Sequence, residues 1–99
     1  MDIRIQSVNF NAEPELIDFV NKKVEKLNQF FNGIVAAEVY LRAENVTGAE
    51  NKFAEIRLLI PGNDVVAKKQ SASFENSVDQ VVEALSRQLK KRKEKVRGV

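Results

Sequence analysis

The 99-residue sequence contains neither cysteine nor histidine. Disulfides, metal sites built from thiolate or imidazole, and nucleophilic catalysis by a Ser–His or Cys–His pair are therefore impossible. The carboxylates, among them Glu38, Glu44, Glu50 and Glu55, show no spacing that singles out a catalytic pair or a metal cage. We therefore expect no enzyme, no metal, no cofactor and no small-molecule substrate.

Long apolar segments are also missing. No apolar run approaches the roughly 18–20 residues that span a bilayer. The first residues, Met-Asp-Ile-Arg-Ile, lack the basic segment and the apolar stretch of a signal peptide. With 43% hydrophobic and 30% charged residues, the composition fits one small soluble globular domain over residues 1–99. We expect this domain in the cytoplasm, away from membranes.

The positive charge is concentrated at one end of the chain. The net charge of +2 is the difference between two larger values. Residues 1–84 carry nine Lys/Arg and thirteen Asp/Glu, a net −4. Residues 85–99 carry seven Lys/Arg and one acid, Glu94, a net +6. A basic terminus on an acidic body indicates a polyanionic partner for that terminus.

Alternation of apolar and polar residues predicts four strands. They cover residues 2–9, 34–44, 52–60 and 65–69. In the second strand, the residues expected to face the core are Val35, Ala37, Val39 and Leu41. The turn Pro61-Gly62-Asn63-Asp64 predicts a hairpin between the last two strands. Short connections among the last three strands predict an antiparallel meander.

A helical period marks two further segments. Residues 14–31 predict one amphipathic helix that stops at Asn32-Gly33. Its apolar stripe consists of Leu16, Val20, Val24, Leu27 and Phe31. A longer helix is predicted from Phe74 to about Lys95, with Ser73 as its N-cap. That helix, about 33 Å long at 1.5 Å per residue, is longer than the strands, so we expect its basic end to project beyond the sheet.

The predicted element order is β-α-β-β-β-α. Helices that cover one face of a sheet make an α+β two-layer sandwich, here with a four-stranded sheet and two helices. The α-β-β-β-α part resembles the topology of double-stranded-RNA-binding domains. It differs from the order of the RRM, and no strand carries the aromatic pair that an RRM needs.

The end of the second helix is crowded with cations. They form a basic helix end over residues 87–97 that consists of Arg87, Lys90, Lys91, Arg92, Lys93, Lys95 and Arg97. A solvated helix end is one explanation, but one or two cations would satisfy the helix dipole, whereas seven repel one another unless an anion compensates. We therefore interpret the segment as phosphate-binding. Arg92 falls near the apolar edge, and we expect its stem to pack there with its charged head in solvent.

The first helix adds Lys22, Lys23 and Lys26. Alone, these lysines fit a solvated helix face as well as a binding site. If both helices pack side by side on one face of the sheet, the two clusters join into one basic surface. Separated cations along a rigid surface suit folded RNA, whose contacts go mainly to phosphates and 2′-hydroxyls.

The other face of the sheet carries mixed charge. Its expected residues are Arg4, Gln6, Glu38, Tyr40, Arg42, Glu55, Arg57 and either Lys68 or Lys69. Tyr40 and the arginines could stack on nucleic-acid bases. The interleaved acids fit cross-strand ion pairs on a solvated face equally well.

Several segments, in order along the chain, carry a family resemblance. They are Ile3-x-Ile5, Leu16-x-x-Phe19-Val20, Lys26-Leu27-x-Gln29-Phe30-Phe31 and Asp79 of the second helix. The most specific segment is Arg87-Gln88-Leu89-x-Lys91-x-Lys93-x-Lys95. Through these motifs, the chain resembles over essentially its full length the ribosome hibernation promoting factors, a family that includes ribosome-associated inhibitor A and the sigma-54 modulation proteins.

The resemblance implies a ribosome-associated translation inhibitor of stationary phase and stress. Such proteins bind the small ribosomal subunit and the 70S ribosome, lie in the mRNA channel against 16S rRNA, and exclude mRNA and tRNA. Lys90 occupies a position that need not be charged in relatives, and we add it to the matching basic positions. The implied rRNA-binding residues are Lys23, Lys26, Arg87, Lys90, Lys91, Lys93 and Lys95.

The resemblance also bears on the form of the protein. Long family members carry a further dimerisation domain, and we expect this chain to be a short form that is monomeric when free. Two other functions remain open. One is a general module for structured RNA, and the other is a transcription regulator whose basic helix docks on an acidic protein.

Overall fold

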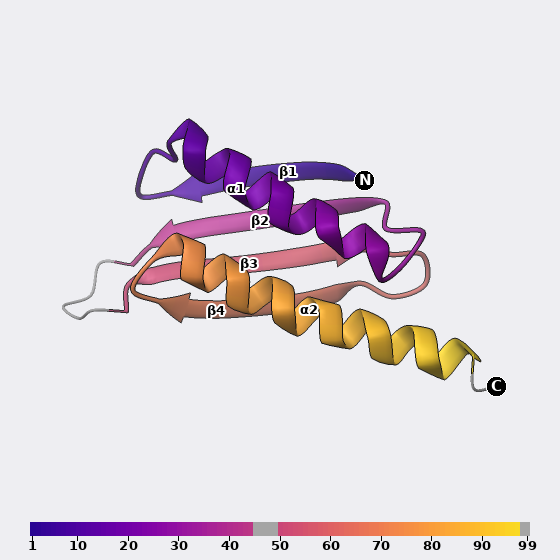
Figure 1. The fold of residues 1–99 in the computed structure, drawn as a ribbon. Helices are drawn as coiled ribbons and strands as arrows, with labels where there is room; N and C mark the ends of the chain where they lie inside the picture. Colours follow the sequence, from indigo (N-terminus) through magenta and orange to yellow (C-terminus); the bar gives the residue numbers. More distant parts are fainter. Residues whose placement is uncertain (45–49, 98–99) are drawn as a thin grey trace.

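The computed structural model describes residues 1–44 and 50–97, with side chains described as far as Arg92 (Figure 1). The elements are β1 (Asp2–Val8), α1 (Pro14–Glu25), the 3-10 helix η1 (Lys26–Gln29), β2 (Ala36–Ala43), β3 (Lys52–Leu59), β4 (Val65–Ser71) and α2 (Phe74–Arg97). Their order confirms the predicted β-α-β-β-β-α chain.

The four strands form one mixed sheet in the order β1-β2-β3-β4. β1 pairs with β2 in parallel, and the other neighbours are antiparallel. Both helices lie on the same face of this sheet, as Figure 1 shows. The predicted α+β two-layer sandwich and the three-stranded meander are therefore confirmed.

The core lies between the sheet and the two helices. Val39 of β2, Ile56 of β3 and Leu85 of α2 are buried, as are Val20 and Val24 of α1. Full burial of an aliphatic side chain of this size contributes about 1.5–3 kcal/mol relative to exposure. Alternation from Ala37 through β2 and along β3 leaves most of the polar side chains of these strands on the opposite sheet face.

The expectation that Val35 faces the core is wrong. β2 begins at Ala36, and Val35 is 61% exposed. Ile34 is buried in its place, at 6% exposed. Gly33, with a φ of 115°, turns the chain just before this point, and the backbone of Val35 joins the sheet through its N–H, which donates to the carbonyl of Leu59 at 2.9 Å. The turn thus shifts the alternation by one residue.

The single helix predicted over residues 14–31 is also wrong beyond Glu25. The chain tightens there into η1, and the Phe30 N–H donates to the Leu27 carbonyl at 3.1 Å. A 3-10 turn winds faster than an α-helix and commonly ends one. Leu27 remains fully buried, and the tighter turn carries Phe30 and Phe31 toward α2, where both contact its cations.

α2 is the longest element and extends past the sheet. Figure 1 shows its C-terminal turns beyond the ends of the strands, as predicted. The whole molecule measures 48 × 24 × 19 Å along its principal axes. Among the residues that the structure describes, no helix combines the length and the apolar character needed to cross a bilayer.

Candidate nucleic-acid interface

The start of α2 is fixed by serine side chains. Ser73 is the N-cap, as predicted, because its Oγ accepts a hydrogen bond from the Asn76 N–H at 3.1 Å. Ser77 is fully buried, and its hydroxyl donates to the Lys52 carbonyl at 2.6 Å. The Ser77 and Ser71 hydroxyls lie 2.7 Å apart. These bonds set the rotation of α2 and therefore the direction of each cation farther along it.

One predicted site residue, Lys23, links the two helices. Its Nζ lies 2.9 Å from Oδ1 of Asp79 on α2 and 5.5 Å from the ring centroid of Phe19. The Lys23 side chain is 33% exposed and that of Asp79 is 49% exposed, so this ion pair lies at the surface between the helices. The ammonium of Lys23 therefore lies where α1 and α2 meet.

Lys90 and Arg92 contact consecutive phenylalanines beyond η1. The Lys90 ammonium lies 4.8 Å from the Phe30 ring centroid, and the Arg92 guanidinium lies 5.8 Å from that of Phe31. Cations at these distances are attracted by the face of an aromatic ring. Together with the ion pair at Lys23, these contacts align the end of α1 with the basic half of α2.

The charged head of Arg92 lies at the surface, as expected, but it is bound to the neighbouring hairpin. Its guanidinium donates to the carbonyl of Asn63 at 2.9 Å and to that of Pro61 at 3.3 Å, in the turn between β3 and β4. The planar guanidinium has five donors and suits such a two-carbonyl site. Arg92 therefore ties α2 to the hairpin.

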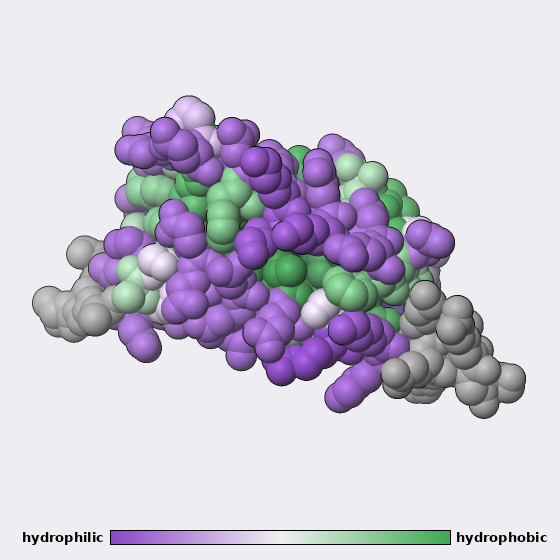
Figure 2. All heavy atoms as spheres, in the orientation of Figure 1, coloured by the Kyte–Doolittle hydropathy of each residue, from purple (hydrophilic) through white to green (hydrophobic). Residues whose placement is uncertain are grey.

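The two predicted clusters lie on the same face of the molecule. The contacts of Lys23 with Asp79 and of Lys90 with Phe30 place η1, and with it the exposed Lys26, beside the middle of α2. Arg87 is exposed, and its Nη1 lies 3.6 Å from Oε1 of Glu83. Figure 2 shows hydrophilic side chains over both helices, with hydrophobic surface visible between them. The predicted joining of the clusters is thus consistent with how the helices pack.

The structure describes the remaining predicted site residues only in part. Lys91 is exposed on α2. The side chains of Lys93 and Lys95 lie outside the described part of the chain, although their backbone belongs to α2.

On the open face of the sheet, the arginines form ion pairs with nearby carboxylates of the same chain. Arg4 pairs with Asp2 at 3.0 Å, Arg42 with Glu44 at 2.7 Å and Arg57 with Asp64 at 3.7 Å. These pairs run along a strand or join β3 to the turn that follows it, so the cross-strand ion pairs that offered one explanation of this face do not form among the described residues. Tyr40 is 43% exposed beside a shallow cavity of about 290 Å³.

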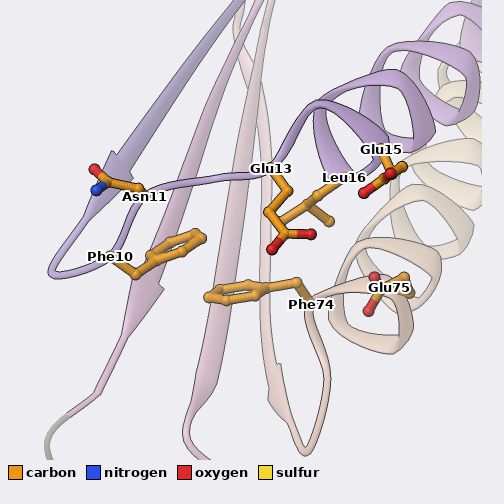
Figure 3. Close-up of a pocket in the computed structure, with 7 residues that line it drawn as sticks. All are labelled: Phe10, Asn11, Glu13, Glu15, Leu16, Phe74 and Glu75. Carbon is orange, nitrogen blue, oxygen red and sulfur yellow. The ribbon is translucent and has the colours of Figure 1, made fainter.

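Sequence reasoning missed a second cavity, of about 300 Å³, at the N-terminal ends of both helices (Figure 3). Phe10 and Phe74 stack in it with ring centroids 4.4 Å apart. The carboxylate of Glu13 lies between Leu16 and Phe74 in this view. Glu15 and Glu75, in the first helical turns, also line the cavity, where the helix dipole favours negative charge. This end is acidic, opposite the basic end of α2.

Comparison with known proteins adds a consistent set of similarities. The sequence profile of the family described as "Sigma 54 modulation protein / S30EA ribosomal protein" matches residues 3–97. A ribosome hibernation promoting factor of Klebsiella oxytoca is 31% identical over 97 residues, which is 98% of either chain. A ribosome hibernation promotion factor of Bacillus subtilis is 29% identical over 97% of this chain but only 50% of its own length.

Solved structures show the same fold. The N-terminal domain of Thermus thermophilus Protein Y is 27% identical, with a TM-score of 0.77 over 92% of this chain and 98% of that domain. A ribosomal subunit interface protein from Coxiella burnetii is 20% identical and superposes with a TM-score of 0.83 over 95% of this chain and 99% of its own. At that identity the second similarity concerns the fold alone.

Proposed function

The chain belongs to the sigma 54 modulation protein / S30EA ribosomal protein family, and on that premise we propose that it is a non-catalytic ribosome hibernation factor. In this proposal it acts in the cytoplasm, binds the small subunit in the decoding channel through phosphates of 16S rRNA, and keeps mRNA and tRNA out. The names of its relatives as ribosome hibernation promoting factors support this role.

The observation that carries the proposal is the basic surface of the two helices. We define this surface by the seven residues predicted to contact rRNA, Lys23, Lys26, Arg87, Lys90, Lys91, Lys93 and Lys95. Ion pairing and aromatic contacts hold the first helix against α2. Cations on a rigid surface bind folded RNA by charge and shape, because most contacts go to phosphates and 2′-hydroxyls.

The mechanism we propose is occupancy of space. A two-layer domain whose longest dimension is 48 Å fills part of a channel that mRNA and tRNA would otherwise use. The basic surface supplies affinity, while the buried core and the Arg92 contacts keep the shape fixed. No chemical step is required, since a bound domain excludes other ligands simply by its volume.

Charge reversal on the basic surface tests the proposal. We expect Lys23→Glu with Lys26→Glu, and separately Arg87→Glu with Lys91→Glu, to weaken co-sedimentation with purified 30S subunits by at least about tenfold, because phosphate contacts become repulsive. The matched control is Arg4→Glu with Lys68→Glu, which changes the net charge equally on the open sheet face. Circular dichroism verifies that each variant is folded. Unchanged binding of both helix variants would contradict the proposal.

Competition separates a decoding-channel ligand from a general RNA-binding module. Ribosomes loaded with mRNA and tRNA should exclude the protein if it occupies the decoding channel. A general module would bind loaded and empty ribosomes equally. A protein-docking regulator would instead keep its partner after nuclease treatment.

A further inference from the structure

β4 is an edge strand that carries two consecutive lysines on opposite faces. In the register with β3, Lys68 lies opposite Glu55, whereas Lys69 lies opposite the fully buried Ala54. Because side chains alternate along a strand, Lys68 belongs to the open face and Lys69 to the face that the helices cover. Both residues are exposed. The side chain of Lys69 therefore emerges at the edge of the sheet, in the helical layer.

The helix next to Lys69 is α2. The Gln88 side-chain amide donates to the Val66 carbonyl at 3.4 Å, and the Ser71 and Ser77 hydroxyls are 2.7 Å apart. These two contacts show that α2 runs antiparallel to β4 on the face of the sheet that the helices cover. Lys69 lies between them along the strand. Lys69 lies three strand residues from Val66, and Lys91 lies about one helical turn beyond Gln88. The two lysines are therefore about 15 Å apart along the sheet.

The side of α2 that faces this edge carries no acid among the described side chains. Residues three and four apart share a helix face, so Gln80, Ala84 and Lys91 lie on the same side as Gln88. The described acids in the body of α2 lie toward α1 instead, because Asp79 pairs with Lys23 of α1 and Glu83 follows Asp79 by four residues on the same helix face. Lys90, in contact with Phe30, faces the α1 side. Lysine side chains therefore extend from both sides of α2, Lys90 toward α1 and Lys91 toward the β4 edge.

We propose that the RNA-binding surface continues over α2 onto the edge of β4, where Lys69 and Lys91 bind a second run of phosphates. This inference rests on the proposed function and extends it to a residue outside the seven of the basic surface. Lys69 has no ion-pair partner within the part of the chain that the structure describes, so its ammonium is available to a phosphate. Lys68, beside Glu55, faces away from the RNA.

Lysines on edge strands also have a protective role, because charge there discourages pairing with another sheet. A glutamate at this position also places a charge on the edge. Lys69→Glu therefore keeps a charged edge while it reverses the attraction to phosphate. Lys68→Glu makes the same charge change one residue away, on the opposite face, and is the matched control.

The test is binding of the full chain to purified 30S subunits at several salt concentrations. We expect Lys69→Glu to weaken binding about three- to tenfold and to reduce the magnitude of the log–log salt slope by about 0.7–0.9, the value for one phosphate contact. Lys68→Glu should change affinity by less than about twofold, since no phosphate contact is lost. Equal effects of the two substitutions would overturn the proposal, as would self-association of the Lys69→Glu variant in sedimentation.

The variant pairs on the helices distinguish a failure of the proposed function from a failure of its extension to β4. If Lys23→Glu with Lys26→Glu loses binding while Lys69→Glu matches Lys68→Glu, the ribosomal function stands and the extension to β4 is wrong. If the helix variants bind like the wild type, the proposed function itself fails. If both the helix variants and Lys69→Glu lose binding, the surface includes the β4 edge.

Discussion

Arg92 illustrates why cations of equal charge have different roles. In the sequence it is one of seven basic residues near the C-terminus. In the structure its guanidinium donates to two carbonyls of the β3–β4 turn and lies over Phe31. Its neighbour Lys91 is exposed on the outer side of α2. One position therefore stabilises the fold, and the other is available to a ligand.

A pair of substitutions separates these roles. Arg92→Lys keeps the charge but loses the planar fork that reaches both carbonyls. We expect it to lower the free energy of unfolding by about 1 kcal/mol, measured by thermal denaturation, with 30S affinity within about twofold of wild type because no phosphate contact is removed.

Lys91→Gln is the counterpart and should show the reverse pattern. Its unfolding free energy should stay within about 0.5 kcal/mol of wild type, as for other exposed positions, while its 30S affinity falls. If Arg92→Lys weakened ribosome binding as much as Lys91→Gln without loss of stability, Arg92 would be an RNA ligand and its contacts with the hairpin incidental.

At the scale of elements, the contact between α1 and α2 decides how the basic surface is assembled. Lys23 is shared with Asp79, so its charge is partly neutralised before any RNA arrives. The pair is solvent-accessible on both sides, and such pairs contribute only about 0–1 kcal/mol to stability. Burial of aliphatic side chains such as Val24 and Leu85, at about 1.5–3 kcal/mol each, stabilises the packing of the helices more strongly than this pair does.

Asp79→Asn tests how far the ion pair with Asp79 limits the binding of Lys23 to phosphate. Removal of the carboxylate frees the Lys23 ammonium for phosphate, and we expect 30S binding to tighten about threefold, which corresponds to about 0.6 kcal/mol. The loss of stability should be less than about 1 kcal/mol. The control, Glu38→Gln, removes one negative charge from the open sheet face. Equal tightening by both variants would show that net charge alone matters, and weaker binding of Asp79→Asn would mean that Asp79 orients Lys23.

Most of the elements were predictable because their periods are clear. Alternation defined β3, with Ala54, Ile56 and Leu58 all buried as expected, and Ser73 marked the start of α2. The failures occur where tertiary contacts outweigh the pattern. Glu25 ends α1 because η1 tightens the chain, and the turn at Gly33 changes which residue before β2 is buried.

The sequence predicted which cations belong to the site but not how they are arranged in space. The cations could be counted from the sequence, and their helices could be assigned. Whether Lys68 or Lys69 faces the helices depends on the pairing register of β4, which a short strand of mixed polarity does not reveal. The attachment of Arg92 to the hairpin depends on the position of a turn some thirty residues earlier, a contact that no local pattern encodes.

The molecule as a whole separates its charges along its length. Both helices start near the cavity lined by Glu13, Glu15 and Glu75. α2 ends in the basic segment beyond the sheet. An acidic body repels RNA phosphates, so we infer that only the basic end and its adjoining surface approach rRNA, which limits non-specific adsorption.

This layout predicts a steep dependence of ribosome binding on salt. If about six phosphates are neutralised, coefficients of about 0.7–0.9 per phosphate give a log–log slope near −4 to −5. The measurement is 30S co-sedimentation from about 50 to 300 mM KCl, a range in which counterion release governs affinity.

Arg87→Gln with Lys91→Gln calibrates that slope, because it removes two of the contacts. The slope should then fall to between about −2.8 and −3.6, since each of the four remaining phosphates contributes about 0.7–0.9. Docking on an acidic protein gives a shallower dependence, because proteins lack the condensed counterions of a nucleic acid. A wild-type slope between 0 and about −1 would therefore mean that phosphates are not the partner of the basic end. A steep wild-type slope that the double substitution leaves unchanged would place the phosphate contacts on other residues.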